Sequence, residues 1–487
     1  MFFHVDQLGS IYDLRENFGL SSLEFQKVIS DRKVWLQEIG VGPGSRAMII
    51  HGNNIDFFAD LLALWSVGAC VACLNPSVTS IEMTNLQKSF RPDYLVVRSL
   101  PSDVQPIDDA IVISISTQDY SKGADLRIRQ SSGAIEEGGS IDAPALVLYT
   151  SGSTGTPKGV VHTFRSLSAR ISLNHSYIPK TEMKNSLNTL PTHFGHGLIG
   201  NCLTPLLAGC NLFTGISGNN ALMLKLSEII DKYSISFFSS VPSFWKLVLH
   251  TSQPQKQSLQ RIHVGSAPFS QKLWREVIAW SGVKNVWNMY GLTETANWVG
   301  GASSLDGIPA EGSVGYAWGG QFAVYEQNSG EVSLSGTGEL LVSTPSVMAG
   351  YFEQSTLTSD SFLDGWLRTG DIGVIENGEA RLVGRSKFEI NKGGIKISPE
   401  ELDGLFEKHA AVSEACAFGI PDNLAGERIG VALVTSNENI SVLELRDWAL
   451  TQLVAEKVPD DWFFVDEIPK NDRGKIDRLN IYSYVKS

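Results

Sequence analysis

The chain has 487 residues, which is too long for one hydrophobic core and predicts two or three domains. Its 43% apolar and 19% charged residues are ordinary for a soluble globular enzyme. The net charge of −13 argues against nucleic acid or an anionic membrane as the main partner, so a site for a polyanion must gather lysine and arginine locally.

The amino terminus has neither a basic segment nor a long apolar one, so we expect no signal peptide. The sequence contains no apolar stretch of about 20 residues, so we expect no membrane span. Cys70 and Cys73 form a C-x-x-C pair inside an apolar segment, and no second pair lies at zinc-site spacing. We therefore predict buried apolar cysteines rather than a metal or redox site, and a reducing cytoplasmic location.

Strands and helices alternate through the first half of the chain. Residues 56–71 are predicted to form a helix that ends at Gly68 and leads into a strand, and residues 94–97 and 110–115 form short β-prone runs. The alternation continues to Val241 and predicts a parallel-sheet α/β body. From about residue 300 to 383, short alternating runs separated by glycines predict a small β-rich subdomain.

A loop of small residues follows the apolar run 146–149. It contains hydroxyl side chains, glycines, Pro157 and Lys158. Such a loop wraps backbone N–H groups, hydroxyls and an ammonium around a polyphosphate without obstruction by side chains. It is not a Walker A loop, because Pro157 precedes Lys158 and Gly159 follows it. We predict phosphate binding, with a flexible surface loop as the alternative.

The segment after Arg385 is predicted to be compact and to mix helix and strand. A helix over 398–409 begins with Ser398 as its N-cap, a proline at its first position and Glu401 at its third. Only nine residues follow Arg478, so we expect no fused carrier-protein domain.

Four further segments accompany the loop in a fixed order. They are YGLTET at 290–295, GWLRTGD at 365–371, GRSKFEI at 384–390 with PEELD at 399–403, and PKNDRGK at 469–475. With these five motifs, from about residue 53 to 478, the chain resembles the adenylate-forming superfamily. This superfamily contains acyl- and aryl-CoA synthetases, adenylation domains of nonribosomal peptide synthetases and beetle luciferases. In type the chain most resembles a free-standing acyl- or aryl-CoA ligase.

The resemblance implies an α/β fold in two parts. A large N-terminal domain, residues 1–385, contains α/β subdomains and the β-rich subdomain. A small mobile α+β C-terminal domain, residues 386–487, follows, with a hinge near Lys387. The family usually has an acidic or polar residue after the hinge lysine, where this chain has Phe388. That departure concerns hinge packing and not the nucleotide chemistry.

The implied reaction is attack of a carboxylate on the α-phosphorus of ATP, which gives an acyl-adenylate and pyrophosphate, followed by displacement of AMP by a thiol. Charge builds on the phosphoryl oxygens, so cations and hydroxyls are required. The residues that match the family's pyrophosphate loop are Thr150, Ser151, Ser153, Thr154 and Lys158.

Other motif positions imply further contacts to ATP. Thr293 matches the α-phosphate contact, and Glu294 matches the carboxylate that holds Mg²⁺, with a solvated acid at a helix start as the alternative. Asp371 matches the ribose ligand, with a turn aspartate as the alternative, and Arg385 is expected on the ribose or phosphate edge. Tyr290 is expected to offer its aromatic face to the base. The adenine-cradling turn, which is otherwise a plain turn, is matched by Gly265, Ser266, Ala267 and Pro268.

Two other motifs concern the C-terminal domain. Lys475 matches the catalytic lysine that bridges the incoming carboxylate and the α-phosphate, and a surface lysine near the terminus is the alternative. Gly393 and Gly394 fall where the family swings a glycine-rich strand against the pantetheine tunnel. A close approach of backbone to ligand requires glycine, although a plain β-turn is the alternative.

The acid pocket is expected around the segment LPTHFGHGL at 190–198. The family places an aromatic residue or a histidine there beside the substrate carboxylate, and His193 and Phe194 are the candidates. Many relatives carry histidine where this chain has Phe194. Trp298 is expected to line and shorten the acyl pocket, with a purely structural core tryptophan as the alternative.

The composition near this segment restricts the acid. No aspartate occurs in 185–227 to hold an α-ammonium, and no arginine occurs in 185–224 to hold a second carboxylate. We therefore predict a small to medium neutral carboxylic acid. Free CoA is the expected acceptor, and the alternative is an adenylation enzyme that loads a carrier-protein phosphopantetheine. A binding-only relative is disfavoured because five motif residues are intact: Lys158, Glu294, Asp371, Arg385 and Lys475.

Overall fold

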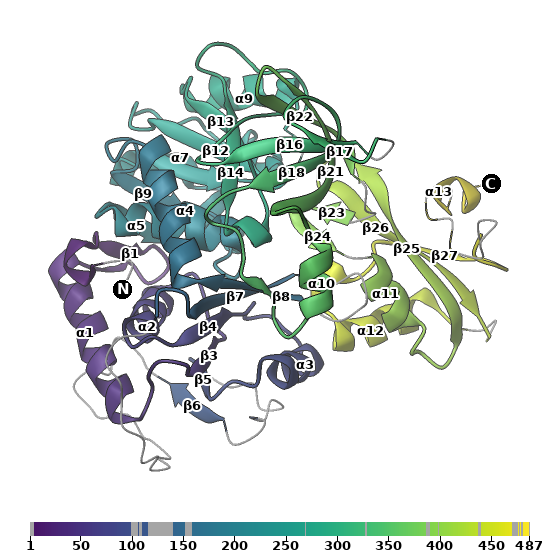
Figure 1. Ribbon diagram of the computed structural model, residues 1–487, viewed down its shortest axis with the longest axis horizontal. Helices are drawn as coiled ribbons and strands as arrows, with labels where there is room; N and C mark the ends of the chain where they lie inside the picture. The colour runs from purple at the N-terminus through teal and green to yellow at the C-terminus, as the bar shows by residue number, and fades with distance from the viewer. Residues whose placement is uncertain are drawn as a thin grey trace.

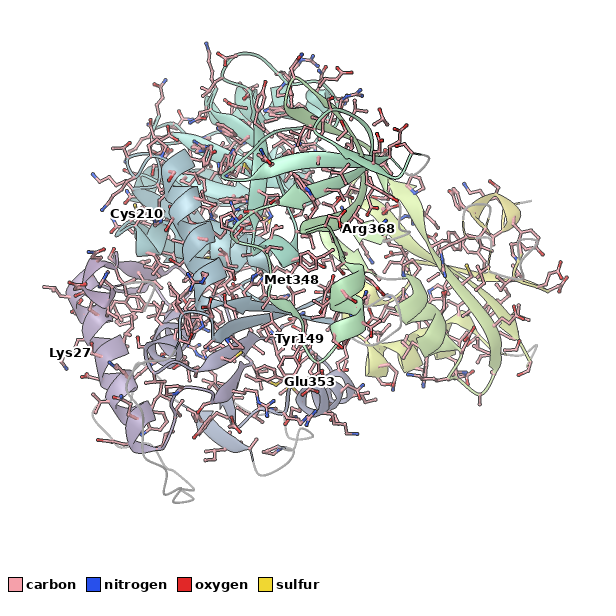
Figure 2. The ribbon with its side chains drawn as sticks, viewed as in Figure 1. Lys27, Tyr149, Cys210, Met348, Glu353 and Arg368 are labelled. Carbon is pink, nitrogen blue, oxygen red and sulfur yellow. The ribbon has the colours of Figure 1, made fainter. Side chains whose placement is uncertain are left out.

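The computed structural model describes residues 4–98, 106, 110–114, 140–150, 158–267, 269–326, 329–385, 390–397, 399–436, 440–469, 476, 478 and 481–486. Within these residues the strands form three sheets, and the segment after residue 390 lies to one side of the rest (Figure 1). The predicted α/β fold is confirmed. Side chains fill the space between helices and sheets, with Met348 and Tyr149 near the middle of the view in Figure 2.

The first sheet follows the order β19-β8-β7-β4-β3-β5-β6. Strands β3 to β7 pair in parallel, as predicted, whereas β8 pairs antiparallel with β7 and with β19. The bounds are β3 Arg46–Ile49, β4 Cys70–Cys73, β5 Tyr94–Val97, β6 Ile111–Ser114, β7 Pro144–Thr150, β8 Lys158–Thr163 and β19 Gly350–Tyr351.

The second sheet follows the order β17-β16-β18-β21-β22-β15-β14-β13-β12-β11-β9-β10-β1-β2, and β20 pairs with β21. Pairing is parallel from β13 to β1 and antiparallel from β14 onward. The predicted β-rich stretch is therefore an antiparallel extension of this sheet. Its strands and the others of the sheet are β1 Ile11–Asp13, β2 Phe18–Leu20, β9 Asn185–Asn188, β10 Asn211–Thr214, β11 Phe237–Ser240, β12 Arg261–Gly265, β13 Val286–Gly291, β14 Trp298–Ser303, β15 Ser313–Ala317, β16 Gln321–Glu326, β17 Glu331–Ser333, β18 Gly336–Ser343, β20 Phe362–Leu363, β21 Trp366–Glu376 and β22 Glu379–Arg385.

The third sheet belongs to the C-terminal segment and has its own buried core around Phe406 and Val431. Its order is β24-β23-β26-β25, with β27 beside β26. This matches the compact mixed segment predicted after Arg385. The bounds are β23 Ile390–Lys392, β24 Ile395–Ile397, β25 Val412–Asp422, β26 Gly426–Thr435 and β27 Asp461–Phe464.

Helices cover the sheets (Figure 1). The predicted helix over 56–71 is α2, which begins after the N-cap Asn54, ends at Ser66 and is followed by Gly68 in the left-handed region at φ +82°. The bounds are α1 Ser22–Glu38, α2 Ile55–Ser66, α3 Ser80–Phe90, α4 Phe164–Tyr177, α5 Thr204–Leu207, α6 Asn220–Met223, α7 Leu226–Tyr233, α8 Pro242–Val248, α9 Gln271–Ser281, α10 Ser355–Asp360, α11 Pro399–Phe406, α12 Val442–Gln452 and α13 Ile481–Tyr484, with shorter turns η1 Val5–Gln7, η2 His196–Leu203, η3 Thr293–Thr295 and η4 Ala455–Lys457.

The predicted burial of Cys70 and Cys73 is confirmed, and all five cysteines are free and buried. Burial raises the pKa of the Cys70 thiol to about 12, so this thiol stays protonated and unreactive near neutral pH. Among the described residues, no helix is both long enough and apolar enough to cross a membrane.

Candidate active site

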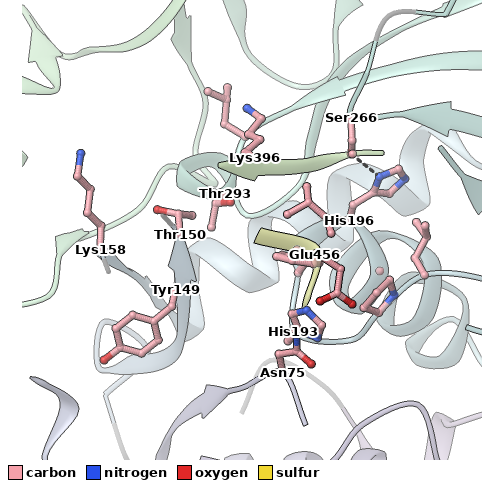
Figure 3. A pocket seen from close by; sticks show the side chains of 18 of the residues that line it. Asn75, Tyr149, Thr150, Lys158, His193, His196, Ser266, Thr293, Lys396 and Glu456 are labelled. Carbon is pink, nitrogen blue, oxygen red and sulfur yellow. Dashed lines mark hydrogen bonds between the residues drawn. The ribbon is translucent and has the colours of Figure 1, made fainter. Parts of the chain in front are cut away.

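A cavity of about 1890 Å³ lies where both N-terminal sheets meet the C-terminal segment. Its wall collects residues from all parts of the chain, from Arg15 to Lys457. Many predicted site residues line it: Thr150, Lys158, His193, Phe194, Ser266, Thr293, Glu294, Trp298, Asp371, Gly393 and Gly394. Figure 3 shows how several of them are arranged, with Thr150 and Thr293 on neighbouring segments.

Other predicted residues take different places. The wall includes neither Gly265 nor Ala267, and Tyr290 lies behind it. Arg385 belongs to β22, but only its backbone is described. Six predicted residues lie outside the described part of the chain, namely Ser151, Ser153, Thr154, Pro268, Lys387 and Lys475.

The ends of β7 and β8 frame the predicted phosphate loop. Thr150 pairs with Lys158 across the two strands, so the residues at the two ends of the predicted loop lie side by side. The Lys158 ammonium lies 5.8 Å from the centroid of the Tyr351 ring. The Tyr351 hydroxyl in turn donates to Glu294 Oε1 at 2.7 Å. One tyrosine therefore contacts both the cation and the carboxylate that the sequence assigns to ATP and its metal.

The turn η3, which carries Thr293 and Glu294, is held through its backbone. The carbonyl oxygens of its three residues accept, in chain order, from His162 Nε2 at 2.7 Å, Met348 N at 2.8 Å and Ser346 Oγ at 3.1 Å. The next residue, Ala296, has φ +67° and ψ −33°. Such a conformation costs of order 1–3 kcal/mol for a residue other than glycine and persists only where its surroundings hold it.

His162→Gln is expected to reduce the loss of stability on acidification. Burial lowers the pKa of His162 from 6.5 to about 4, so protons that bind the unfolded chain are excluded from the folded one. This contribution is complete above about pH 6.5 and is lost as pH falls towards 4; the loss amounts to about 2 kcal/mol at about pH 5. Thermal unfolding at neutral and mildly acidic pH measures the difference, and equal losses in variant and wild type would contradict it.

Asp371 is 3% exposed and lies within β21 rather than in a turn. The Tyr290 hydroxyl donates to Asp371 Oδ2 at 2.7 Å, while the Tyr290 ring packs edge-on against Phe322 with centroids 6.1 Å apart. The β21–β22 register places Asp371 opposite Arg385. Tyr290, which was expected to face the adenine base, therefore orients the carboxylate of Asp371, which was expected to bind the ribose.

Two histidines of segment 190–198 line the cavity. The ring centroids of His193 and Phe194 lie 4.1 Å apart. Burial lowers the pKa of His193 to about 4. His196 begins η2, a π-helical turn of a kind often found at functional sites. Its ring nitrogens lie 2.8 Å from Ser266 Oγ and 2.6 Å from Ser239 Oγ, and burial lowers its pKa to about 3. Both imidazoles are therefore neutral near pH 7.

His196 was not singled out from the sequence. The signal was a second histidine three residues after His193 in the same segment. Trp298 lines the cavity and also belongs to the core, because it is only 2% exposed. Its ring centroid lies 5.7 Å from that of His196 and 4.5 Å from that of His263. Trp298 is therefore both a core residue and a residue of the cavity wall.

The glycine pair of the C-terminal segment lies on the cavity wall. Asn391 Nδ2 donates to Ser266 O at 2.8 Å, and Ser243 Oγ donates to Gly393 O at 3.4 Å. Gly394 has φ +89°, and a β-carbon there would lie 3.0 Å from Val241 Cγ1. Gly393 and Gly394 form the turn between β23 and β24, which is the β-turn alternative, and they also approach the N-terminal domain closely. The left-handed backbone and the close approach both favour glycine.

A second contact between the two parts is ionic. Lys457 Nζ lies 2.8 Å from Glu401 Oε1 and 3.9 Å from Glu82 Oε1. Thr79 Oγ1 also donates to Gln452 O at 3.4 Å. Desolvation raises the pKa of Glu82, which Lys457 partly offsets. The N-terminal end of α3 therefore contacts the C-terminal segment.

Known proteins are similar to this chain in sequence and in architecture. The AMP-binding enzyme family matches residues 33–352, and the AMP-binding enzyme C-terminal domain matches residues 401–475. An oxalate–CoA ligase of Arabidopsis thaliana is 28% identical, over 91% of this chain and 89% of that one. A 4-chlorobenzoate–CoA ligase of an Arthrobacter species is 28% identical, over 98% and 92%.

Solved structures show the same fold. A double mutant of o-succinylbenzoate CoA synthetase from Bacillus subtilis, bound with its product analogue, matches with a TM-score of 0.84 and 24% identity, over 98% of this chain and 96% of that one. The same enzyme in complex with AMP matches with a TM-score of 0.68 and 23% identity, over 98% and 95%. The chain thus belongs to the AMP-binding enzyme family, and it is an AMP-forming ligase of the acyl-CoA synthetase type, as its five motifs predict.

Proposed function

We propose that this enzyme converts a small to medium neutral carboxylic acid to its CoA thioester. The acid carboxylate attacks the α-phosphorus of ATP, which forms an acyl-adenylate and releases pyrophosphate. The CoA thiol then attacks the acyl carbon and releases AMP. The observation that carries the proposal is one cavity whose wall includes residues of four of the five motifs, among them Lys158, Thr293, Asp371 and Glu401.

Each ATP contact is assigned to a group whose chemistry suits it. Lys158, with Thr150 and the loop hydroxyls of Ser151, Ser153 and Thr154, takes the pyrophosphate, and Thr293 takes the α-phosphate. Asp371 accepts from the ribose hydroxyls, with Arg385 opposite it in the ladder. The adenine is assigned to the predicted turn at 265–268, of which Ser266 lines the cavity wall. Charge that develops on phosphoryl oxygens is stabilised by these fixed cations and donors.

Mg²⁺ is proposed to bind Glu294. A carboxylate suits a hard cation that usually keeps phosphate and water ligands, and such a cation offsets charge on the phosphates when bound. Among the described residues no group of three or more His, Cys, Asp or Glu side chains is placed to hold a metal alone.

Two arrangements of the chain are proposed to serve the two half-reactions. Residues 386–487 form a mobile C-terminal domain that rotates about Lys387. The present arrangement serves thioester formation: Gly393 and Gly394 lie on the cavity wall, and the match to the product-analogue complex exceeds the match to the AMP complex. Lys475 bridges the acid and the α-phosphate in the other arrangement.

The chemistry of the wall supports an uncharged acyl group. His193 and His196 are neutral, and Trp298 adds an aromatic surface. Arg15 lines the wall, but it is ion-paired at 3.1 Å with Asp13, which is 2% exposed. A second carboxylate on the acid would therefore meet a guanidinium that is already neutralised.

ATP–pyrophosphate exchange across an acid panel tests the proposal. We expect 4-chlorobenzoate, benzoate and short monocarboxylates to give more exchange than oxalate or malonate, and α-amino acids to give almost none. An ammonium buried without an acidic partner costs several kcal/mol, on the order of a 10³-fold loss. The best acid is then offered free CoA and a phosphopantetheinylated carrier protein. Faster exchange with a diacid or amino acid, or thioester only on the carrier, would contradict the assignment.

A further inference from the structure

His162 lies on β8 behind the cavity, between the phosphate loop and η3. It is fully buried. Its Nε2 lies 2.7 Å from Thr293 O, and its Nδ1 lies 3.3 Å from Ser166 Oγ on α4. The cavity wall does not include His162. The imidazole therefore acts on the site only through the backbone of Thr293.

The protonation of this histidine is fixed by its surroundings. Burial lowers its pKa to about 4, so the ring carries one proton near pH 7. A carbonyl oxygen only accepts, so that proton is on Nε2 and points to Thr293 O. Nδ1 is then an acceptor 3.3 Å from Ser166 Oγ, which accepts from Thr163 N at 3.1 Å and also lies 3.1 Å from Thr163 O. The Nε2–H donor is thus held in one orientation.

The position of His162 on β8 links two predicted parts of the ATP site. Residues 158 and 162 are four apart on one strand, so Lys158 and His162 share a face. One rigid strand therefore carries the predicted pyrophosphate cation and the donor to η3. Because η3 is a single turn followed by the strained Ala296, its orientation depends on the groups that hold its carbonyls.

We propose that His162 is a positioning residue for the adenylation step. Its Nε2–H fixes the Thr293 carbonyl, and this orients the Thr293 hydroxyl and the Glu294 carboxylate towards ATP and its metal. The proposal rests on the proposed function, because it assumes that these two side chains contact ATP. It adds a residue that does not itself contact the nucleotide.

The test compares His162→Leu with a matched control elsewhere in the chain. His175 Nε2 lies 2.7 Å from Thr204 O, which is the same kind of bond at the same length, and neither residue lines the cavity. We expect His162→Leu to lower kcat/KM for ATP in pyrophosphate exchange by about 10- to 100-fold, since small misplacements at a reacting centre have effects of that size. It should also raise the Mg²⁺ concentration needed for half-maximal rate, and leave the KM of the acid unchanged. His175→Leu should change none of these.

Two polar variants keep the test decisive if His162→Leu does not fold. The amide nitrogen of His162→Gln reaches about as far as Nε2, whereas that of His162→Asn reaches only about as far as Nδ1. We expect glutamine to restore most of the exchange activity and asparagine to restore little. If His162 had only a structural role, its replacement would lower the unfolding temperature but would not change the Mg²⁺ concentration needed for half-maximal exchange rate.

The outcomes separate this inference from the proposed function. If the wild-type enzyme shows no pyrophosphate exchange with any acid of the panel, the proposed function is overturned, and this inference with it. An active wild type whose His162→Leu variant behaves like His175→Leu overturns the inference alone. Equal activity of the glutamine and asparagine variants would also overturn it.

Discussion

Gly394→Leu is expected to leave ATP–pyrophosphate exchange nearly unchanged and to lower the rate of thioester formation more than about 100-fold. In the present arrangement Gly394 has φ +89°, and a β-carbon would lie 3.0 Å from Val241 Cγ1 and 3.8 Å from Ser266 Cβ. A leucine side chain therefore cannot enter this arrangement without moving the C-terminal domain off the cavity. Exchange and thioester formation from supplied acyl-adenylate are measured separately.

A neighbouring glycine provides the control. At Gly393 a β-carbon would lie 3.5 Å from Ser243 Oγ, an ordinary contact, and φ is +61°. Gly393→Ala should therefore retain much more thioester formation than Gly394→Leu. Lys475→Ala should show the reverse pattern, with exchange abolished and thioester formation retained. If either Gly394→Leu or Lys475→Ala damaged both half-reactions equally, the two-arrangement proposal would be wrong.

Short-range patterns in the sequence predicted the local structure well. The apolar run before the loop 151–157 forms β7, Gly68 follows α2, and the alternating glycine-punctuated runs form β16, β18 and β22. These features depend on propensity and side-chain periodicity over a few residues. The motifs also predicted part of the cavity wall, because each carries several side chains whose chemistry suits ATP.

Contacts between distant segments could not be predicted in the same way. His162 is 131 residues from Thr293, and Tyr290 is 81 residues from Asp371. A single histidine in a strand or a tyrosine before a glycine carries no local signal for such a partner. The place of Tyr290 behind the wall follows from the packing of β13 in the sheet, which the sequence alone does not specify.

Asp371→Ala is expected to weaken ATP binding by more than about 100-fold while acid binding changes little. A carboxylate that accepts from both ribose hydroxyls makes two charge-assisted hydrogen bonds, each worth about 1.5–3 kcal/mol. Asp371 is 3% exposed, so water screens these bonds only weakly. Calorimetric titration of the variant with ATP, and separately with the best acid, measures both affinities.

Tyr290→Phe distinguishes the effect of the Asp371 carboxylate on ATP affinity from the effect of the Tyr290 hydroxyl that orients it. This variant removes the hydroxyl that donates to Asp371 Oδ2 at 2.7 Å but keeps the charge. The expected loss in ATP affinity is about tenfold, which corresponds to one hydrogen bond of about 1.5 kcal/mol. Asp371→Ala also leaves the buried Tyr290 hydroxyl without this acceptor, which can lower stability. The affinity of each variant for ATP is therefore measured the same number of degrees below its own unfolding temperature. An Asp371→Ala enzyme that binds ATP like the wild type would remove Asp371 from the ribose site, and its bond to Tyr290 would then be purely structural.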